Sequence, residues 1–343
     1  NNGTQGDNDR VNDAASIVLR GGTLGLKGRS SVISTETVGN VLAASGTSII
    51  SSAIGDNNGS SISEATLTLT SFSRNAAAGA TVGFGQIYNI PTGTAAGNLG
   101  TIGVAERIIV TGGMPTTNNI LGGWAVKENF FNTNLVEFVG YNSAFGVGAL
   151  SEAGFAGYDG SAFPVVNQPA QNIRLTAGGT VTTGGSVLNS LNLASNTTSA
   201  VALNFAAGGD VLNLTSGGLV VQNAIASAGA TTIGTTGTPG ILTAGGTNPG
   251  ASSDLFLYYY ANGGATLTIN SQITNNPTDG SAVRLIDWGG IWGNSNVILA
   301  NGTNNYSGGT VVNQNTLTIA ATGNIPAGGL TINGGLVTQT SGG

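Results

Sequence analysis

The stretch Thr310–Ile319 reads TVVNQNTLTI, and after a turn at Gly323 the segment Gly328–Val337 reads GGLTINGGLV. In both segments apolar residues alternate with Thr or Asn, and Gly or Asn separates one short run from the next. Alternation with a period of two and many β-branched residues is typical of strands with one buried face. The two segments therefore predict short strands joined by tight turns.

The same pattern recurs over much of the chain. It appears as ATLTLT, DVLNL, GGLVV and ATLTI at residues 65–70, 210–214, 217–221 and 265–269. A β-sandwich and a parallel β-solenoid both fit short alternating strands. Uncharged Thr and Asn at the outward positions favour the solenoid, because sandwiches usually carry Lys and Glu there. Frequent Gly also lets the backbone of one coil pass close to the next.

In such a solenoid each coil pairs with the coils before and after it. We expect inward Leu, Ile and Val side chains to stack into ladders, and Asn or Thr to form polar ladders. A coil of roughly 20 to 25 residues fits the spacing of the turns, as in other repeat folds.

Composition limits the function classes. The chain has 343 residues with 58 Gly, 7% charged residues, a net charge of −6 and 40% hydrophobic residues. Hydrophobicity at this level argues against disorder. The acidic balance argues against nucleic acid, which needs a basic stripe, and against an anionic membrane surface. No apolar run approaches the roughly 20 residues of a membrane-spanning helix.

The sequence contains no His and no Cys. Serine-histidine-aspartate triads, cysteine nucleophiles and the usual zinc ligand sets are therefore excluded. Only a mechanism based on carboxylates would remain open to an enzyme. We expect no cofactor and no enzymatic activity.

The middle of the chain departs from the repeat pattern between about residues 127 and 171. This part is richer in charged and aromatic residues, and insertions in solenoids map to loops on one face. We predict three parts: N-terminal β-helix coils at 1–126, a lobe or insertion at 127–171, and C-terminal β-helix coils at 172–343.

Several blocks resemble the bacterial autotransporter-associated β-strand repeat proteins, which are long surface polypeptides rich in Gly, Thr and Asn. The block NGTNNYSGGTVVN resembles that family's N-T-Y-S/T-G-G-T-x-V/I-N repeat. Further similar blocks are GDNDRVND, TETVG, NILGGWA and NIRLTAGG. These five blocks are residues 301–313, 6–13, 35–39, 119–125 and 172–179, and together they are spread over most of the chain.

The resemblance implies a right-handed parallel β-helix and export to the bacterial cell surface. The predicted fold is therefore all-β, a right-handed parallel β-helix (β-solenoid) with a side lobe around residues 127–171. One departure is that the family's K-x-G-x-G-T-L-x-L-x-G coil is replaced by LIDWGGIWG at Leu285–Gly293.

An acidic group near the start of the chain, Asp7, Asp9 and Asp13, is one candidate site. Carboxylate oxygens suit calcium, although the nonapeptide array of calcium β-rolls is missing. A paired-carboxylate glycosidase is a second interpretation. A charged turn at the corner of a coil is the interpretation that we favour.

Two other groups of residues stand out. Glu106, Arg107, Lys127 and Glu128 fit surface ion pairs better than an active pair. The aromatic residues Trp288 and Trp292, with Tyr258, Tyr259 and Tyr260, fit either a platform that stacks on a glycan or the filling of a core. Core filling is the simpler interpretation.

Asn-x-Ser/Thr sequons also occur, but chance produces them in a chain so rich in Asn and Thr.

The first and last residues show no obvious polar cap, which soluble solenoids require. We therefore expect head-to-tail self-association or covalent continuation in a longer chain. The function predicted is a structural extracellular or cell-surface fibre protein. An adhesin that binds a glycan or another cell through the lobe or the aromatic residues is the alternative, and a polysaccharide-active enzyme is third.

Overall fold

The computed structural model describes residues 10–29, 32–53, 64–86, 106–129, 136–195, 201–223, 230–246, 252–261, 265–289 and 295–340. These residues form strands and turns, without any helix. Nor does the described chain offer a helix long and apolar enough to cross a membrane. The chain divides into two compact units, Asn1–Gly157 and Tyr158–Gly343.

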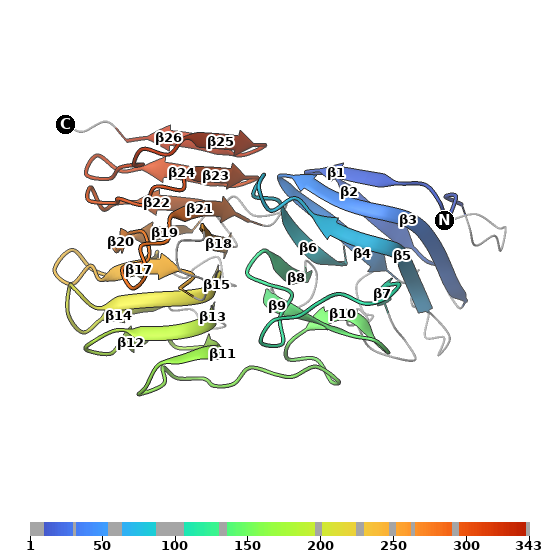
Figure 1. The fold of residues 1–343 in the computed structure, drawn as a ribbon, viewed down its shortest axis with the longest axis horizontal. Coiled ribbons are helices and arrows are strands. Elements are labelled where there is room, and N and C mark those ends of the chain that lie inside the picture. The colour runs from blue at the N-terminus through green and yellow to red at the C-terminus, as the bar shows by residue number, and fades with distance from the viewer. Residues whose placement is uncertain are drawn as a thin grey trace. The chain divides into compact units, whose positions relative to one another are not determined.

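Unit 1 contains two sheets (Figure 1). Its strands are β1 (Ile17–Arg20), β2 (Thr23–Lys27), β3 (Ile33–Ser45), β4 (Thr47–Ala53), β5 (Glu64–Arg74), β6 (Thr81–Gln86), β7 (Glu106–Val110), β8 (Ala125–Asn129), β9 (Glu137–Asn142) and β10 (Gly146–Ala149). One sheet has the order β1-β3-β5-β7, and all its pairs are parallel. The other runs β2-β4-β6-β8 in parallel, and β9 and β10 then pair antiparallel.

Unit 2 contains two long parallel ladders that run from β11 and β12 to β25 and β26 (Figure 1). Its strands are β11 (Gln168–Leu175), β12 (Gly179–Val181), β13 (Ser186–Ser195), β14 (Ala202–Phe205), β15 (Val211–Asn223), β16 (Thr231–Ile233), β17 (Ile241–Ala244), β18 (Ser253–Ala261), β19 (Thr266–Ile269), β20 (Gln272–Ile273), β21 (Val283–Trp288), β22 (Asn296–Leu299), β23 (Thr310–Asn313), β24 (Thr316–Ile319), β25 (Leu330–Asn333) and β26 (Leu336–Gln339). The orders are β11-β13-β15-β18-β21-β23-β25 and β12-β14-β16-β19-β22-β24-β26. The prediction of an all-β chain with parallel sheets is confirmed.

A third, shorter ladder explains why the coils differ in length. The first part of β15 pairs with β17, which pairs with β20, whereas the second part of β15 pairs with β18. Where the chain passes through this ladder, it takes more residues to return to the neighbouring strand. Arg284 of β21 bonds to Asp254 of β18, which lies 30 residues earlier. Near the end of the ladder the return is shorter, because Asn333 of β25 bonds to Asn313 of β23, only 20 residues earlier. The expected repeat of 20 to 25 residues agrees with the 20-residue separation of the last paired strands and is shorter than the 30-residue separation in the middle.

Apolar side chains stack from strand to strand inside unit 2. One ladder joins Leu203, Ile233, Ile269, Leu299 and Ile319. Burying an aliphatic side chain of this size contributes about 1.5–3 kcal/mol, so the ladders are the main source of stability. Polar ladders run beside them, as expected from the Thr and Asn content. The hydroxyls of Thr318 and Thr338, for example, lie 2.8 Å apart.

The predicted division at residues 127 and 171 remains a prediction. The described part of that segment contains the end of β8, the antiparallel strands β9 and β10, and turns that lead to β11.

The corner between β23 and β24 gives a prediction about stability. Gln314 has a positive φ of 54°, and Gly334 has a φ of 77° at the corresponding corner of the next coil. A left-handed conformation disfavours residues with a Cβ by about 1–2 kcal/mol, and the larger backbone entropy of Gly when unfolded offsets about half of that. We expect Gln314→Gly to stabilise unit 2 by about 0.5–1 kcal/mol in thermal unfolding. Gln339→Gly, within β26, should destabilise it, and equal effects of the two changes would contradict this account.

Candidate functional site

The strands β25 and β26, here called the terminal edge, end both long ladders among the described residues. Leu330 and Ile332 continue core ladders, because they pair with Thr310 and Val312 of β23. Yet Leu330 and Ile332 are 45% and 49% exposed, whereas Val312 is fully buried. The terminal edge therefore presents apolar side chains at positions that are buried in β23, and the position of Ile332 is also buried in β21 and β18.

Charge does not protect the terminal edge. The sequence contains no Asp, Glu, Lys or Arg after Asp287. Exposed edge strands in natural proteins usually carry charged residues or Pro that prevent pairing with another chain. In contrast, β1 and β2, which lie at the ends of the two sheets of unit 1, carry Arg20 and Lys27.

The opposite end of unit 2 has an aromatic side chain against its core. Phe163 packs on the core cluster, and a Cβ added at Gly179 would come within 2.9 Å of its ring. The Tyr158 hydroxyl accepts a hydrogen bond from Asn192 Nδ2 at 2.9 Å, and the Arg174 guanidinium lies 5.7 Å from the centre of the Tyr158 ring. This end therefore differs from the terminal edge, where the core residues are exposed.

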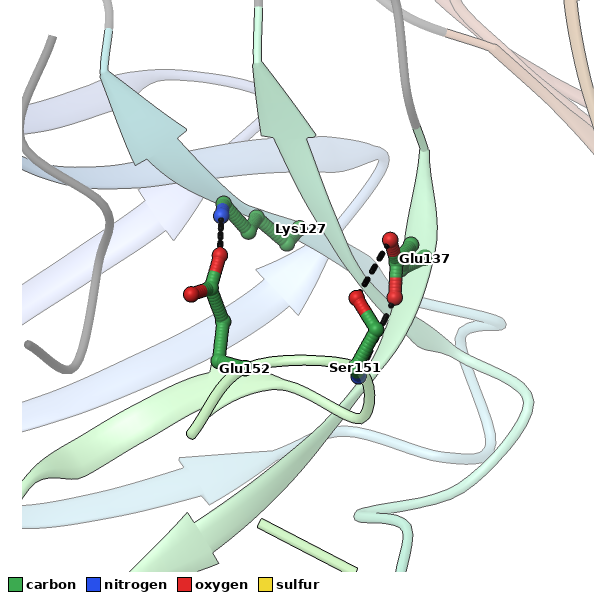
Figure 2. A network of polar contacts seen from close by, with 4 residues as sticks. All are labelled: Lys127, Glu137, Ser151 and Glu152. Atoms are coloured by element: carbon green, nitrogen blue, oxygen red, sulfur yellow. Dashed lines mark hydrogen bonds and ion pairs between the residues drawn. The ribbon is translucent and has the colours of Figure 1, made fainter. Parts of the chain in front are cut away.

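At the end of unit 1, a polar network fastens the antiparallel strands β9 and β10 (Figure 2). Lys127 Nζ donates to Glu152 Oε1 at 2.7 Å. Ser151 donates to Glu137 through both its backbone N–H, at 3.2 Å, and its hydroxyl, at 2.8 Å. Lys127 and Glu137 also lie directly opposite each other on β8 and β9. The network therefore joins β8, β9 and the turn after β10.

The ion pairs and the burial in unit 1 change the interpretation of four residues. We expected Glu106, Arg107, Lys127 and Glu128 to be surface ion pairs, and Lys127 and Arg107 do form ion pairs. Their partners are Glu152 and Glu64, which the sequence analysis did not select. Glu106, Lys127 and Glu128 are also buried rather than on the surface. The error arose because cross-strand neighbours are set by register, which sequence spacing does not reveal.

The first strands of unit 1 border a cavity. It has a volume of about 190 Å³ and an apolar part formed by Leu24, Leu26, Val38 and Leu67. At its edge Glu36 accepts hydrogen bonds from the backbone N–H groups of Arg10 and Val11, at 3.0 and 2.7 Å. The carboxylate thereby fixes the chain that precedes β1.

The aromatic residues predicted to contact a glycan are buried where the structure describes them. Trp288 is fully buried, Tyr258 is 1% exposed and Tyr260 is 9% exposed. The rings of Tyr258 and Trp288 meet edge to face with their centres 4.7 Å apart. Trp292 lies outside the described residues. The burial supports the simpler interpretation of core filling, and the glycan contact stays a prediction.

The acidic group at the start of the chain is only partly described. Asp13 is exposed and lies in a turn, while Asp7 and Asp9 lie outside the described residues. Within the described ranges, no group of three or more carboxylate side chains is arranged to hold a metal ion. The calcium interpretation therefore stays a prediction.

Sequence reasoning missed one residue, Asp287. It is fully buried in β21, where it accepts a hydrogen bond from Asn315 Nδ2 at 2.8 Å. Burial raises its pKa from 3.8 to about 8, and the hydrogen bond from Asn315 offsets part of that rise. The signal in the sequence is a single Asp inside the apolar run LIDW, a position that a strand pattern assigns to the core.

No protein-family model, no curated protein and no solved structure matches this chain.

Proposed function

We propose that this chain is a stretch of right-handed parallel β-helix that serves as a structural element of a bacterial surface or extracellular fibre. Its last coil is continued by another coil of the same kind, from a second copy stacked head to tail or from a longer chain. The observation that carries the proposal is the exposure of Leu330 and Ile332 at core positions of an uncharged terminal edge.

Energetics favour continuation at this edge. Covering a Leu or Ile side chain that is about half exposed returns roughly 1 kcal/mol each, from the full value of about 1.5–3 kcal/mol. A new coil would also pair the open backbone groups of β25 and β26, and it would extend the polar ladders that reach Asn333 and Thr338. These gains follow from repetition of a pattern, which suits a mechanical role better than a chemical one.

The proposed location of the protein is the bacterial cell surface. The low charge, the Gly/Thr/Asn-rich repeats and the resemblance to autotransporter-associated repeat proteins support export to the cell surface.

A single added charge tests the proposal. Ile332→Lys places an ammonium group at the terminal edge, where a covering coil would have to bury it at a large cost. We expect the wild-type chain to form longer rods as its concentration rises, in light scattering and negative-stain electron microscopy, and Ile332→Lys to remain single. Thr268→Lys, on the outer side of β19, adds the same charge away from the edge and should assemble like the wild type. Single wild-type particles at all concentrations would contradict head-to-tail assembly.

A further inference from the structure

Asp287 occupies a core position in β21, two strands before β25 of the terminal edge in the same ladder. Parallel pairing aligns it with Leu257 of β18 on one side and with Val312 of β23 on the other. All three side chains are fully buried. Val312 in turn pairs with Ile332 of the terminal edge. A carboxyl group therefore replaces an aliphatic side chain in a ladder that ends at the exposed Ile332.

The carboxyl group is only half satisfied. Oδ1 accepts the bond from Asn315, but Oδ2 has no hydrogen-bond partner among the described residues. A buried charge without a partner is strongly unfavourable, and a neutral carboxyl group avoids it.

The other titratable groups near Asp287 supply no positive charge. Tyr306 is buried with its hydroxyl 2.7 Å from the Thr310 hydroxyl, and Tyr259 lies on the core side of β18. Burial raises the pKa of Tyr306 to about 12, the bond to Thr310 lowers it, and the charge of Asp287 raises it further. Burial alone raises the pKa of Tyr259. The charged residues of β18 and β21, Asp254 and Arg284, pair with each other at 2.8 Å on the alternate face.

Asn315 connects this carboxyl group to the terminal edge. Its side chain donates to Asp287, and its backbone carbonyl accepts the N–H of Leu336, the first residue of β26, at 2.8 Å. Its own Oδ1 accepts the N–H of Thr316 at 2.9 Å. A change at Asp287 therefore acts on the residue that holds the corner of the last coil.

We propose that Asp287 is a proton switch: loss of its proton loosens the last two coils, β23 to β26, and thereby controls whether the terminal edge is formed. The control of assembly rests on the proposed function, whereas the opening of the coils does not. Proton loss leaves an anion among Leu257, Val312 and Tyr306. The buried anion becomes stable only when water hydrates it, and water reaches it only when β21 and β23 separate.

The direction of the pH dependence follows from linkage. The folded chain holds this proton up to a pKa of about 8, whereas an opened chain releases it at the ordinary value of 3.8. The contribution of this proton to the stability of the coils is therefore fully present below pH 3.8 and is lost as the pH rises toward 8. Opening coupled to the release of one proton becomes about tenfold more favourable per pH unit in that window.

Hydrogen exchange of the full chain between pH 5 and pH 9 tests the switch. After correction for the intrinsic rate of each amide, we expect protection of β23–β26 to fall by up to about tenfold per unit below pH 8. Asp287→Asn should remove this fall, and so should Asp287→Leu, which continues the aliphatic ladder if Asn packs poorly. Asp254→Asn removes a carboxylate from the other face of β18 and should retain the fall. A wild-type protein without the fall, or equal falls in wild type and Asp287→Asn, would overturn the proposal.

Light scattering of the same samples separates the two proposals. If the chain never assembles but its last coils open with pH as described, the proposed head-to-tail assembly fails and the switch stands. If it assembles to the same extent from pH 5 to pH 9, with Asp287→Asn like the wild type, the control of assembly fails and the structural role stands.

Discussion

We expect Gly217→Ala to lower the free energy of unfolding of unit 2 by about 2 to 5 kcal/mol, the sum of left-handed strain and overpacking. Gly217 has a positive φ of 72° and lies in β15, between the part that pairs with β17 and the part that pairs with β18. A Cβ at this position would overlap the backbone carbonyl oxygen of Asp254. Because that oxygen belongs to a strand of the next coil, the overlap cannot be relieved by a change of rotamer. Urea denaturation of the full chain, with hydrogen exchange of β15 and β18, measures the effect.

Gly209→Ala is the matched control. A Cβ at Gly209 would have no atom within 4 Å, and its backbone is not left-handed. We expect a change within about 0.5 kcal/mol, as for ordinary surface substitutions. If both variants were equally stable, Gly217 would not be a close approach between neighbouring strands, and the change of pairing partner within β15 would need another explanation.

Gly217 also shows how far the sequence predicted the fold. The runs at 210–214 and 217–221 looked like two strands, because Gly-Gly usually ends one. They are parts of one strand, β15, which changes its pairing partner at Gly217. The runs at 310–319 and 265–269, by contrast, became β23, β24 and β19 nearly as expected. Local alternation therefore located most strands, but it could not reveal the third ladder, because turn residues occur both at bends and at chain reversals.

The candidate sites were harder to predict for a related reason. Alternation identifies the two faces of a strand but not what covers them. In β18, Leu257 and Tyr259 face the core, and Phe256 and Tyr258, on the other face, are at most 4% exposed. An aromatic run of this kind looks like an exposed platform only if one face of the strand is assumed to be in contact with solvent. Asp287 was missed because a single Asp in a strand is normally interpreted as a residue that faces solvent, whereas this one is buried.

The polar network at the end of unit 1 gives the other large prediction. Glu152→Ala leaves the Lys127 ammonium, whose side chain is only 9% exposed, without the carboxylate 2.7 Å away. Removing one partner of a buried ion pair typically destabilises a protein by about 3–5 kcal/mol, because the remaining charge is desolvated. We expect a loss in that range, seen in urea denaturation and as faster hydrogen exchange in β8, β9 and β10. Lys127→Met should cost less, since the Glu152 side chain is 17% exposed and reaches water more easily.

Two further variants decide whether the charge or the packing matters. The double change Lys127→Met with Glu152→Leu removes both charges and should return the stability to within about 1 kcal/mol of wild type. Glu64→Ala breaks a second ion pair of the described part of this unit, and it leaves an Arg107 side chain that is 25% exposed, so the loss should be about 1 kcal/mol or less. If the double variant were as unstable as Glu152→Ala, the network would act through shape alone.

A loosened hairpin of β9 and β10 would also expose the edge of β8. Glu152→Ala should therefore promote association that Ile332→Lys does not block. The ends of the two units would then differ as their strand pairing does: β9 and β10 pair antiparallel at one end, and the other ends in parallel strands with Leu330 and Ile332 exposed.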